Sequence, residues 1–64
     1  MMEKTVRLLR VTAVAARLSV TTRHVYNLIA DGRLPAIRVS SRATRVSEED
    51  LEQYMEANRL EVGA

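Results

Sequence analysis

Apolar residues recur at helical spacing in three stretches of this chain, which cover residues 11–18, 22–30 and 48–58. Within each stretch they fall one, three or four residues apart, which is the pattern of one buried helix face. These positions are Val14, Ala15 and Leu18, then Val25, Leu28 and Ile29, then Leu51, Tyr54 and Met55. The pattern predicts three short amphipathic helices. One apolar cluster is expected to join them, made of Leu18, Val25, Leu28, Leu51 and Met55.

Capping residues indicate where these helices begin and end. Thr21 precedes the second helix with a hydroxyl that can accept a backbone N–H of its first turn. Residues 47–50, Ser-Glu-Glu-Asp, form a capping-box variant whose acids suit the positive end of the third helix. Gly32 can take the left-handed conformation that ends the second helix. Arg10 is not a capping residue, so Thr12 is the candidate N-cap of the first helix.

Between the second and third helices the pattern changes from helical spacing to alternation. Ile37 and Val39 share one face of a first strand, and Thr44 and Val46 share one face of a second. A two-residue turn at 41–42 pairs Ile37 with Val46 and Val39 with Thr44, so that both apolar faces point inward. The segment therefore predicts a two-stranded β-hairpin.

The same register places Arg38 opposite Arg45 and puts Arg42 at the tip of the hairpin. Like charges directly across a ladder are destabilising. Three arginines on one small hairpin are better explained if an anion lies against them. The alternative, that long side chains on a surface simply extend into water, stays open at this point.

Length and composition place the chain in a narrow class. Its 64 residues make one small domain, and without cysteine it has neither disulfides nor a zinc–thiolate site. No apolar run approaches the roughly 20 residues that cross a bilayer. We expect a flexible N-terminus at 1–7, one domain at 8–59 and a tail at 60–64. The protein is expected to be cytoplasmic and nucleoid-associated, with no membrane partner.

Charge is divided unevenly along the chain. Residues 1–47 carry nine of the ten Lys and Arg against two acids, a net +7, whereas residues 48–64 carry one Arg against six acids, a net −5. Nine of the ten cations are Arg, which favours forked contacts to phosphates and base edges. Such a polarised molecule presents a basic side to a polyanion and an acidic side away from it.

Residues for catalysis are almost absent. His24 is the only histidine, and no cysteine or second histidine could share a metal with it. The carboxylates at 48–50 are first-turn helix acids without a base or nucleophile beside them, and there is no glycine-rich loop. We therefore expect no enzyme activity, no metal and no cofactor.

The second helix instead carries residues that read nucleic acid. At about 100° per residue, Arg23 and Asn27 lie nearly opposite its apolar face, with Tyr26 beside them. Arg is a competent reader of guanine and Asn of adenine, which favours base contacts for these two. Tyr26 could also simply cover the edge of the core, and the interpretation favoured here is a phosphate or sugar contact.

A longer motif connects these features. It consists of an Ala-rich helix, a V-[ST]-x-x-x-V-Y-x-L-I-x-x-G-x-L-P run, a basic hairpin and an acidic helix that opens near E-D-L. The matching residues are Val20, Thr21, Val25, Tyr26, Leu28, Ile29, Gly32, Leu34 and Pro35, then Arg38, Arg42 and Arg45, then Glu49, Asp50 and Leu51. Over residues 9–55 the chain resembles the excisionase family, small winged-helix proteins related to MerR-type DNA-binding domains. Two departures are Ser19, where the family often has a turn glycine, and Arg10, where a Ser or Thr cap is common.

The resemblance implies a mainly α fold with a β-hairpin, a winged helix-turn-helix ordered as helix, helix, two-stranded wing and helix. It implies a recombination directionality factor that binds double-stranded DNA, bends it and helps a separate integrase toward excision of a phage or mobile element. The expected DNA contacts are Thr22, Arg23, Tyr26 and Asn27 on the recognition helix, and Arg38, Ser41, Arg42 and Arg45 on the wing.

Two other functions remain open from the sequence. The nearer is a small AlpA-type transcription regulator that uses the same fold on a promoter. The other is a protein-interaction module that acts through the acidic third helix. Because the chain has two oppositely charged sides and no dimerisation helix, we also expect neighbouring copies to meet head to tail on DNA.

Overall fold

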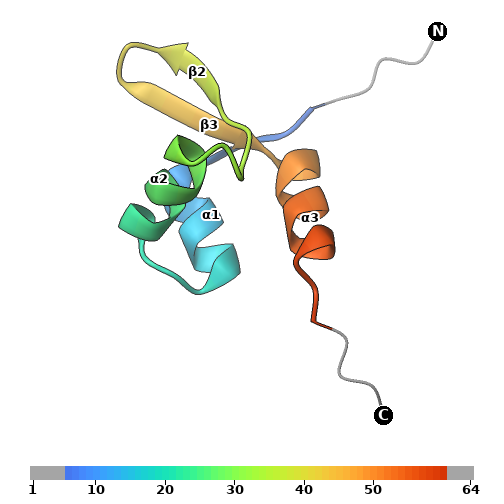
Figure 1. The fold of residues 1–64 in the computed structure, drawn as a ribbon. Helices are drawn as coiled ribbons and strands as arrows, with labels where there is room; N and C mark the ends of the chain where they lie inside the picture. The colour runs from blue at the N-terminus through green and yellow to red at the C-terminus, as the bar shows by residue number, and fades with distance from the viewer. Residues whose placement is uncertain (1–5, 61–64) are drawn as a thin grey trace, which may run out of the picture.

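The computed structural model describes residues 6–60, which form three helices and a three-stranded antiparallel sheet (Figure 1). The elements in chain order are β1 (Leu8–Arg10), α1 (Val11–Leu18), α2 (Thr22–Ala30), β2 (Ile37–Ser40), β3 (Ala43–Ser47) and α3 (Glu48–Ala57). This is the predicted winged helix-turn-helix. Most of the expected N-terminal segment 1–7 and of the tail 60–64 lies outside the described residues.

The sheet has one strand more than the sequence predicts. Its order is β1-β3-β2, so that β3 lies in the middle and pairs antiparallel on both sides. The added strand, β1, spans only three residues and pairs Leu9 with Val46 and Arg10 with Arg45. Three residues are too few to show an alternating pattern, and the partner strand lies far along the chain. The two-stranded wing therefore continues at its base into a three-stranded sheet.

The register of the wing is correct at its tip and wrong at its base. Ser40 pairs with Ala43 across the predicted two-residue turn, but Arg38 then pairs with Thr44 and Ile37 with Arg45. An irregularity between Arg38 and Ser40 gives β2 one extra residue, as a β-bulge does, and shifts every later pair by one position. Arg38 therefore does not lie opposite Arg45.

Burial corrects the predicted faces of the wing as well. Ile37 and Val39 are 42% and 57% exposed, although the alternation predicted both to point inward. On β3 the prediction is confirmed for Val46, which is fully buried, while Thr44 on the same face is half-buried. The helices pack only against the base of the sheet, so β2 runs past them into solvent (Figure 1).

Two of the three predicted caps are confirmed. The Thr21 hydroxyl accepts the backbone N–H of His24 at 3.1 Å, and the Ser47 hydroxyl accepts that of Asp50 at 3.0 Å. Thr12 as the cap of α1 is wrong, because α1 begins at Val11 directly after β1. Arg10 takes the N-cap position in an extended conformation, with no hydrogen bond from its side chain to the helix.

Both helices of the helix-turn-helix end in the same way: a left-handed residue is followed by one whose backbone N–H donates to the carbonyl five residues earlier. After α2, Gly32 has φ of +77°, and the N–H of Arg33 donates to the Leu28 carbonyl at 2.9 Å. After α1, Ser19 has φ of +58°, and the N–H of Val20 donates to the Ala15 carbonyl at 3.0 Å. This is the Schellman geometry. In α1 it is made without glycine, so Ser19 bears backbone strain.

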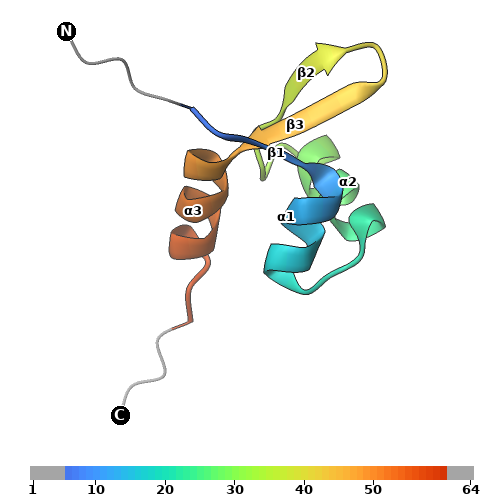
Figure 2. The same ribbon diagram turned by 180° about the vertical axis from the view of Figure 1, so that it is seen from behind.

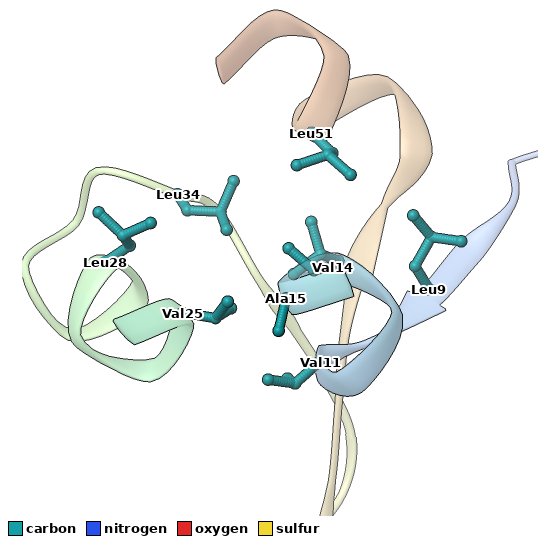
Figure 3. Packing of buried hydrophobic residues seen from close by; sticks show 9 residues of the cluster. Leu9, Val11, Val14, Ala15, Val25, Leu28, Leu34 and Leu51 are labelled. Atoms are coloured by element: carbon teal, nitrogen blue, oxygen red, sulfur yellow. The ribbon is translucent and has the colours of Figure 1, made fainter. Parts of the chain in front are cut away.

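Nine buried apolar side chains form one core beneath the sheet (Figure 3). They are Leu9, Val11, Val14, Ala15, Val25, Leu28, Leu34, Val46 and Leu51. Leu51 extends from α3 toward Val14 and Leu34, and it is the only fully buried residue of that helix (Figure 3). The predicted cluster is therefore correct for Val25, Leu28 and Leu51, while Leu18 packs at its edge. It is wrong for Met55, which is 41% exposed.

Three contacts fix the first turn of α3 against the rest of the domain. The Ser47 cap is one, and the backbone N–H of Glu48 donates to the Arg7 carbonyl at 2.8 Å. The Glu48 carboxylate also accepts a hydrogen bond from the Arg17 guanidinium of α1 at 2.7 Å. Helix α1 thus lies between α2 on one side and α3 on the other (Figures 1 and 2).

Replacing Ser19 with glycine should stabilise the domain. The Ser19→Gly variant relieves a left-handed strain of about 1–2 kcal/mol and loses about 0.5–1 kcal/mol to glycine's greater freedom when unfolded. We expect a net gain of about 0.5–1 kcal/mol, which raises the melting temperature by about 2–8 °C. The control is Ser19→Ala, which keeps the β-carbon and should give no gain in a thermal melt. Equal melting temperatures for both variants would contradict the assignment of strain to Ser19.

Candidate nucleic-acid interface

The outward face of α2 is a row of exposed polar side chains. Thr22, Arg23, Tyr26 and Asn27 all lie on it, and Tyr26 is 52% exposed. Within residues 6–60, no hydrogen bond or ion pair occupies these four side chains. The opposite face carries Val25 and Leu28 into the core, so burial fixes the direction in which the polar row points. The row is available to a ligand without breaking any contact of the domain.

The wing presents a second exposed cation beyond the helices. Its turn is formed by Ser41 and Arg42, both exposed, and the backbone N–H of Arg42 reaches the Ser40 hydroxyl at 3.4 Å. The hairpin extends away from α3, so that its tip lies at the far end of the domain from that helix (Figure 1). Arg42 can therefore contact a ligand that α3 does not approach.

Arg38 and Arg45, the other two wing arginines, lie on opposite faces of the sheet. Arg38 pairs with Thr44, which shares a face of β3 with the buried Val46, so Arg38 is on the side that faces the helices. Arg45 pairs with Ile37 and Arg10 and is on the outer side. It is half-buried, and its guanidinium donates to the Thr44 carbonyl at 3.0 Å.

Apart from Asp31, which directly follows α2, the acidic residues in the described part of the chain gather at α3, away from the wing tip. Three of them, Glu48, Glu49 and Asp50, occupy its first turn, and Glu48 is paired with Arg17. His24 is exposed in the first turn of α2. In the described part of the chain there is no group of three or more His, Cys, Asp or Glu that could hold a metal ion. The same residues include no helix long and apolar enough to cross a membrane.

Two short helices joined by a three-residue turn, with an exposed Arg and Asn on the second, form the helix-turn-helix arrangement that places a helix in the DNA major groove. The sequence model of the family described as "Helix-turn-helix domain" matches residues 8–59. This chain belongs to that family. No match was found among curated proteins or among solved structures.

Membership of this helix-turn-helix family makes the protein a DNA-binding one. The matched segment, residues 8–59, includes the polar row of α2, the wing and α3. The site residues predicted from the sequence are thus all exposed or half-buried, on α2 and on the wing. The sequence did not show that Arg10 lies beside Arg45, because only the pairing of β1 with β3 brings them together.

We predict different roles for the arginines on DNA. Arg23→Ala and Asn27→Ala should relax sequence preference, each by about 1–3 kcal/mol at one base position, because their side chains are placed to read base edges. Arg38→Ala and Arg45→Ala should weaken binding to all sequences about equally and flatten the salt dependence, because phosphate contacts carry no sequence information. Titration of a panel of single-base variants of one site measures both effects. Identical profiles for the two sets would refute the division.

Proposed function

We propose that this helix-turn-helix protein is an excisionase-type architectural factor, which binds specific sites, bends the DNA and directs an integrase toward excision of a phage or mobile element. One observation carries the proposal: the domain exposes both an Arg-Tyr-Asn row on α2, with no intramolecular side-chain hydrogen bonds among the described residues, and Arg42 at the wing tip. These are the two places where a winged helix meets adjacent grooves. The resemblance of residues 9–55 to excisionases supports the recombination role.

In this proposal α2 enters the major groove through Thr22, Arg23, Tyr26 and Asn27. Arg23 and Asn27 read base edges, while Thr22 and Tyr26 form hydrogen bonds with the sugar-phosphate backbone of the DNA. The wing carries Arg42 into the neighbouring minor groove, and Ser41, Arg38 and Arg45 bind phosphates. A narrow minor groove concentrates negative potential, so an inserted arginine favours the compressed, bent form of DNA. The protein then acts by shaping DNA and performs no chemistry itself.

Excision in vitro tests this role directly. With the integrase of an element that carries the gene, the protein should stimulate recombination between left and right attachment sites. Arg42→Ala should lose most of the stimulation and reduce the bend seen by circular-permutation mobility. Gln53→Ala, at an exposed position on α3 outside the proposed contacts, is the control and should keep the bend. Specific binding near a promoter with no effect on excision would instead identify an AlpA-type regulator.

The salt dependence of binding separates these DNA-binding roles from the protein-interaction alternative. If about five phosphates are neutralised, log K should fall against log salt with a slope near −4 to −5. The basic part of the chain, net +7 over residues 1–47, supplies the cations. A slope near zero, or no binding to random DNA at moderate salt, would favour a module that acts through α3.

We further propose that neighbouring copies assemble head to tail along DNA. On α3 and just after it, Glu52, Met55, Glu56 and Arg59 line a surface hollow, and Met55 is 41% exposed. Arg59 pairs with Glu56 at 3.6 Å, and with two acids against one arginine the hollow is still net acidic. Such an acidic face with an apolar centre is complementary to the basic part of the next copy. A heterologous contact of this kind does not close into a ring, so it extends along the duplex.

This arrangement predicts a monomer in free solution and cooperative binding to adjacent sites. Analytical ultracentrifugation without DNA measures the first, and titration of one-site and multi-site fragments measures the second. Glu52→Gln together with Glu56→Gln should leave one-site affinity nearly unchanged and reduce cooperativity. A stable dimer without DNA, or equal affinity per site on both fragments, would rule the array out.

A further inference from the structure

Arg10 and Arg45 form a cation pair across two strands of the sheet. The register of β1 and β3 makes them direct Cα partners, and Ile37 of β2 lies next in the same row. Side chains at directly opposite positions in an antiparallel pair share a face, with Cβ atoms about 4.5–5.5 Å apart. The buried Leu9 and Val46 pair at the neighbouring position and point to the other face. The two guanidinium groups therefore lie on the outer side of the sheet.

In the part of the chain that the structure describes, no carboxylate pairs with either of these two arginines. The ion pairs within residues 6–60 join Arg17 to Glu48 and Arg59 to Glu56, and neither Arg10 nor Arg45 takes part. Among residues 6–60, the only hydrogen bond from either side chain runs from Arg45 Nη1 to the Thr44 carbonyl. It uses one of the five N–H donors of that guanidinium. The outer-face neighbours along the two strands, Leu8 and Ser47, carry no charge.

Like charges placed directly opposite cost stability in the free protein. A small domain with nine core residues has little stability to spare. A ligand that offsets the repulsion explains why two arginines occupy these facing positions. Two planar guanidinium groups side by side match the oxygens of a phosphate better than any single carboxylate. Figure 2 shows β1 lying along the base of β3 and leading directly into α1.

We infer that Arg10 and Arg45 together bind one phosphate of a nucleic-acid backbone, at a site separate from the recognition helix and the wing tip. This site rests on the proposed DNA binding and adds detail to it. Arg45 then contacts a phosphate together with Arg10 on the outer face of the sheet, and not together with the other wing residues. The phosphate belongs either to the flank of the duplex that α2 already holds or to a second duplex. In both cases the same two side chains bind it.

The test is the double variant Arg10→Gln with Arg45→Gln, compared with Arg59→Gln. The double variant should flatten the slope of log K against log salt by about 1, the share of one phosphate. It should keep the preference between cognate and mismatched sites. Its melting temperature should stay equal or rise, because a repulsion is removed. Arg59→Gln removes one charge at the acidic end and should change none of the three.

Duplex length distinguishes the two sources of the phosphate. If the double variant flattens the salt slope on a site with about ten flanking base pairs and leaves it unchanged on the bare site, the phosphate is on the same duplex. If the wild-type protein captures a second labelled duplex on an immobilised one and the variant does not, the phosphate is on another duplex. Either result supports the pair as a binding site.

Other outcomes overturn the inference. A salt slope equal to that of Arg59→Gln on every duplex means that no phosphate is bound there. A lower melting temperature for the double variant means that the pair supports the fold instead. If the wild-type protein itself binds no DNA, the proposed function fails. If the wild-type protein binds DNA and the double variant keeps the same salt slope, only the Arg10–Arg45 site fails.

Discussion

The central position of β3 is the constraint on which the rest of the structure depends. This five-residue strand bonds to β1 on one side and β2 on the other, buries Val46 in the core and ends in the Ser47 cap of α3. The entry to α1, the wing and α3 are therefore all positioned by one strand. Because α3 contributes only Leu51 fully to the core, its placement also relies on this cap, on the bond from the Glu48 N–H to the Arg7 carbonyl and on the Arg17–Glu48 pair.

The same strand divides the basic residues into two groups. Successive side chains on β3 alternate between faces, so Arg45 points away from the core and away from Arg38. Arg38 lies on the helix side of the sheet with α2, whereas Arg45 joins Arg10 on the outer side. The basic residues that give residues 1–47 a net charge of +7 therefore do not form one uniform patch. They lie on at least two separate surfaces of the domain. This division gives a small domain more than one way to hold a charged polymer.

Much of the candidate site could be predicted from the sequence, because helical periodicity depends on neighbouring residues. The buried Val25 and Leu28 fix the orientation of α2, and the exposure of Arg23, Tyr26 and Asn27 follows from it. The tip of the wing was also predictable, because a two-residue turn is a local feature. The neighbours of each wing arginine were not predictable, since one bulge in β2 and a three-residue β1 decide them.

The sequence by itself determined all three helices, the caps at Thr21 and Ser47, and the glycine stop after α2, because each depends on bonds between residues a few positions apart. Only the tertiary structure decided the strand β1, the register at the base of the wing, and the exposure of Met55 and Ile37. These depend on which surfaces are left after Leu51, Val46 and Leu9 fill the core. In so small a domain the core cannot cover every apolar side chain that the pattern marks as inward-facing.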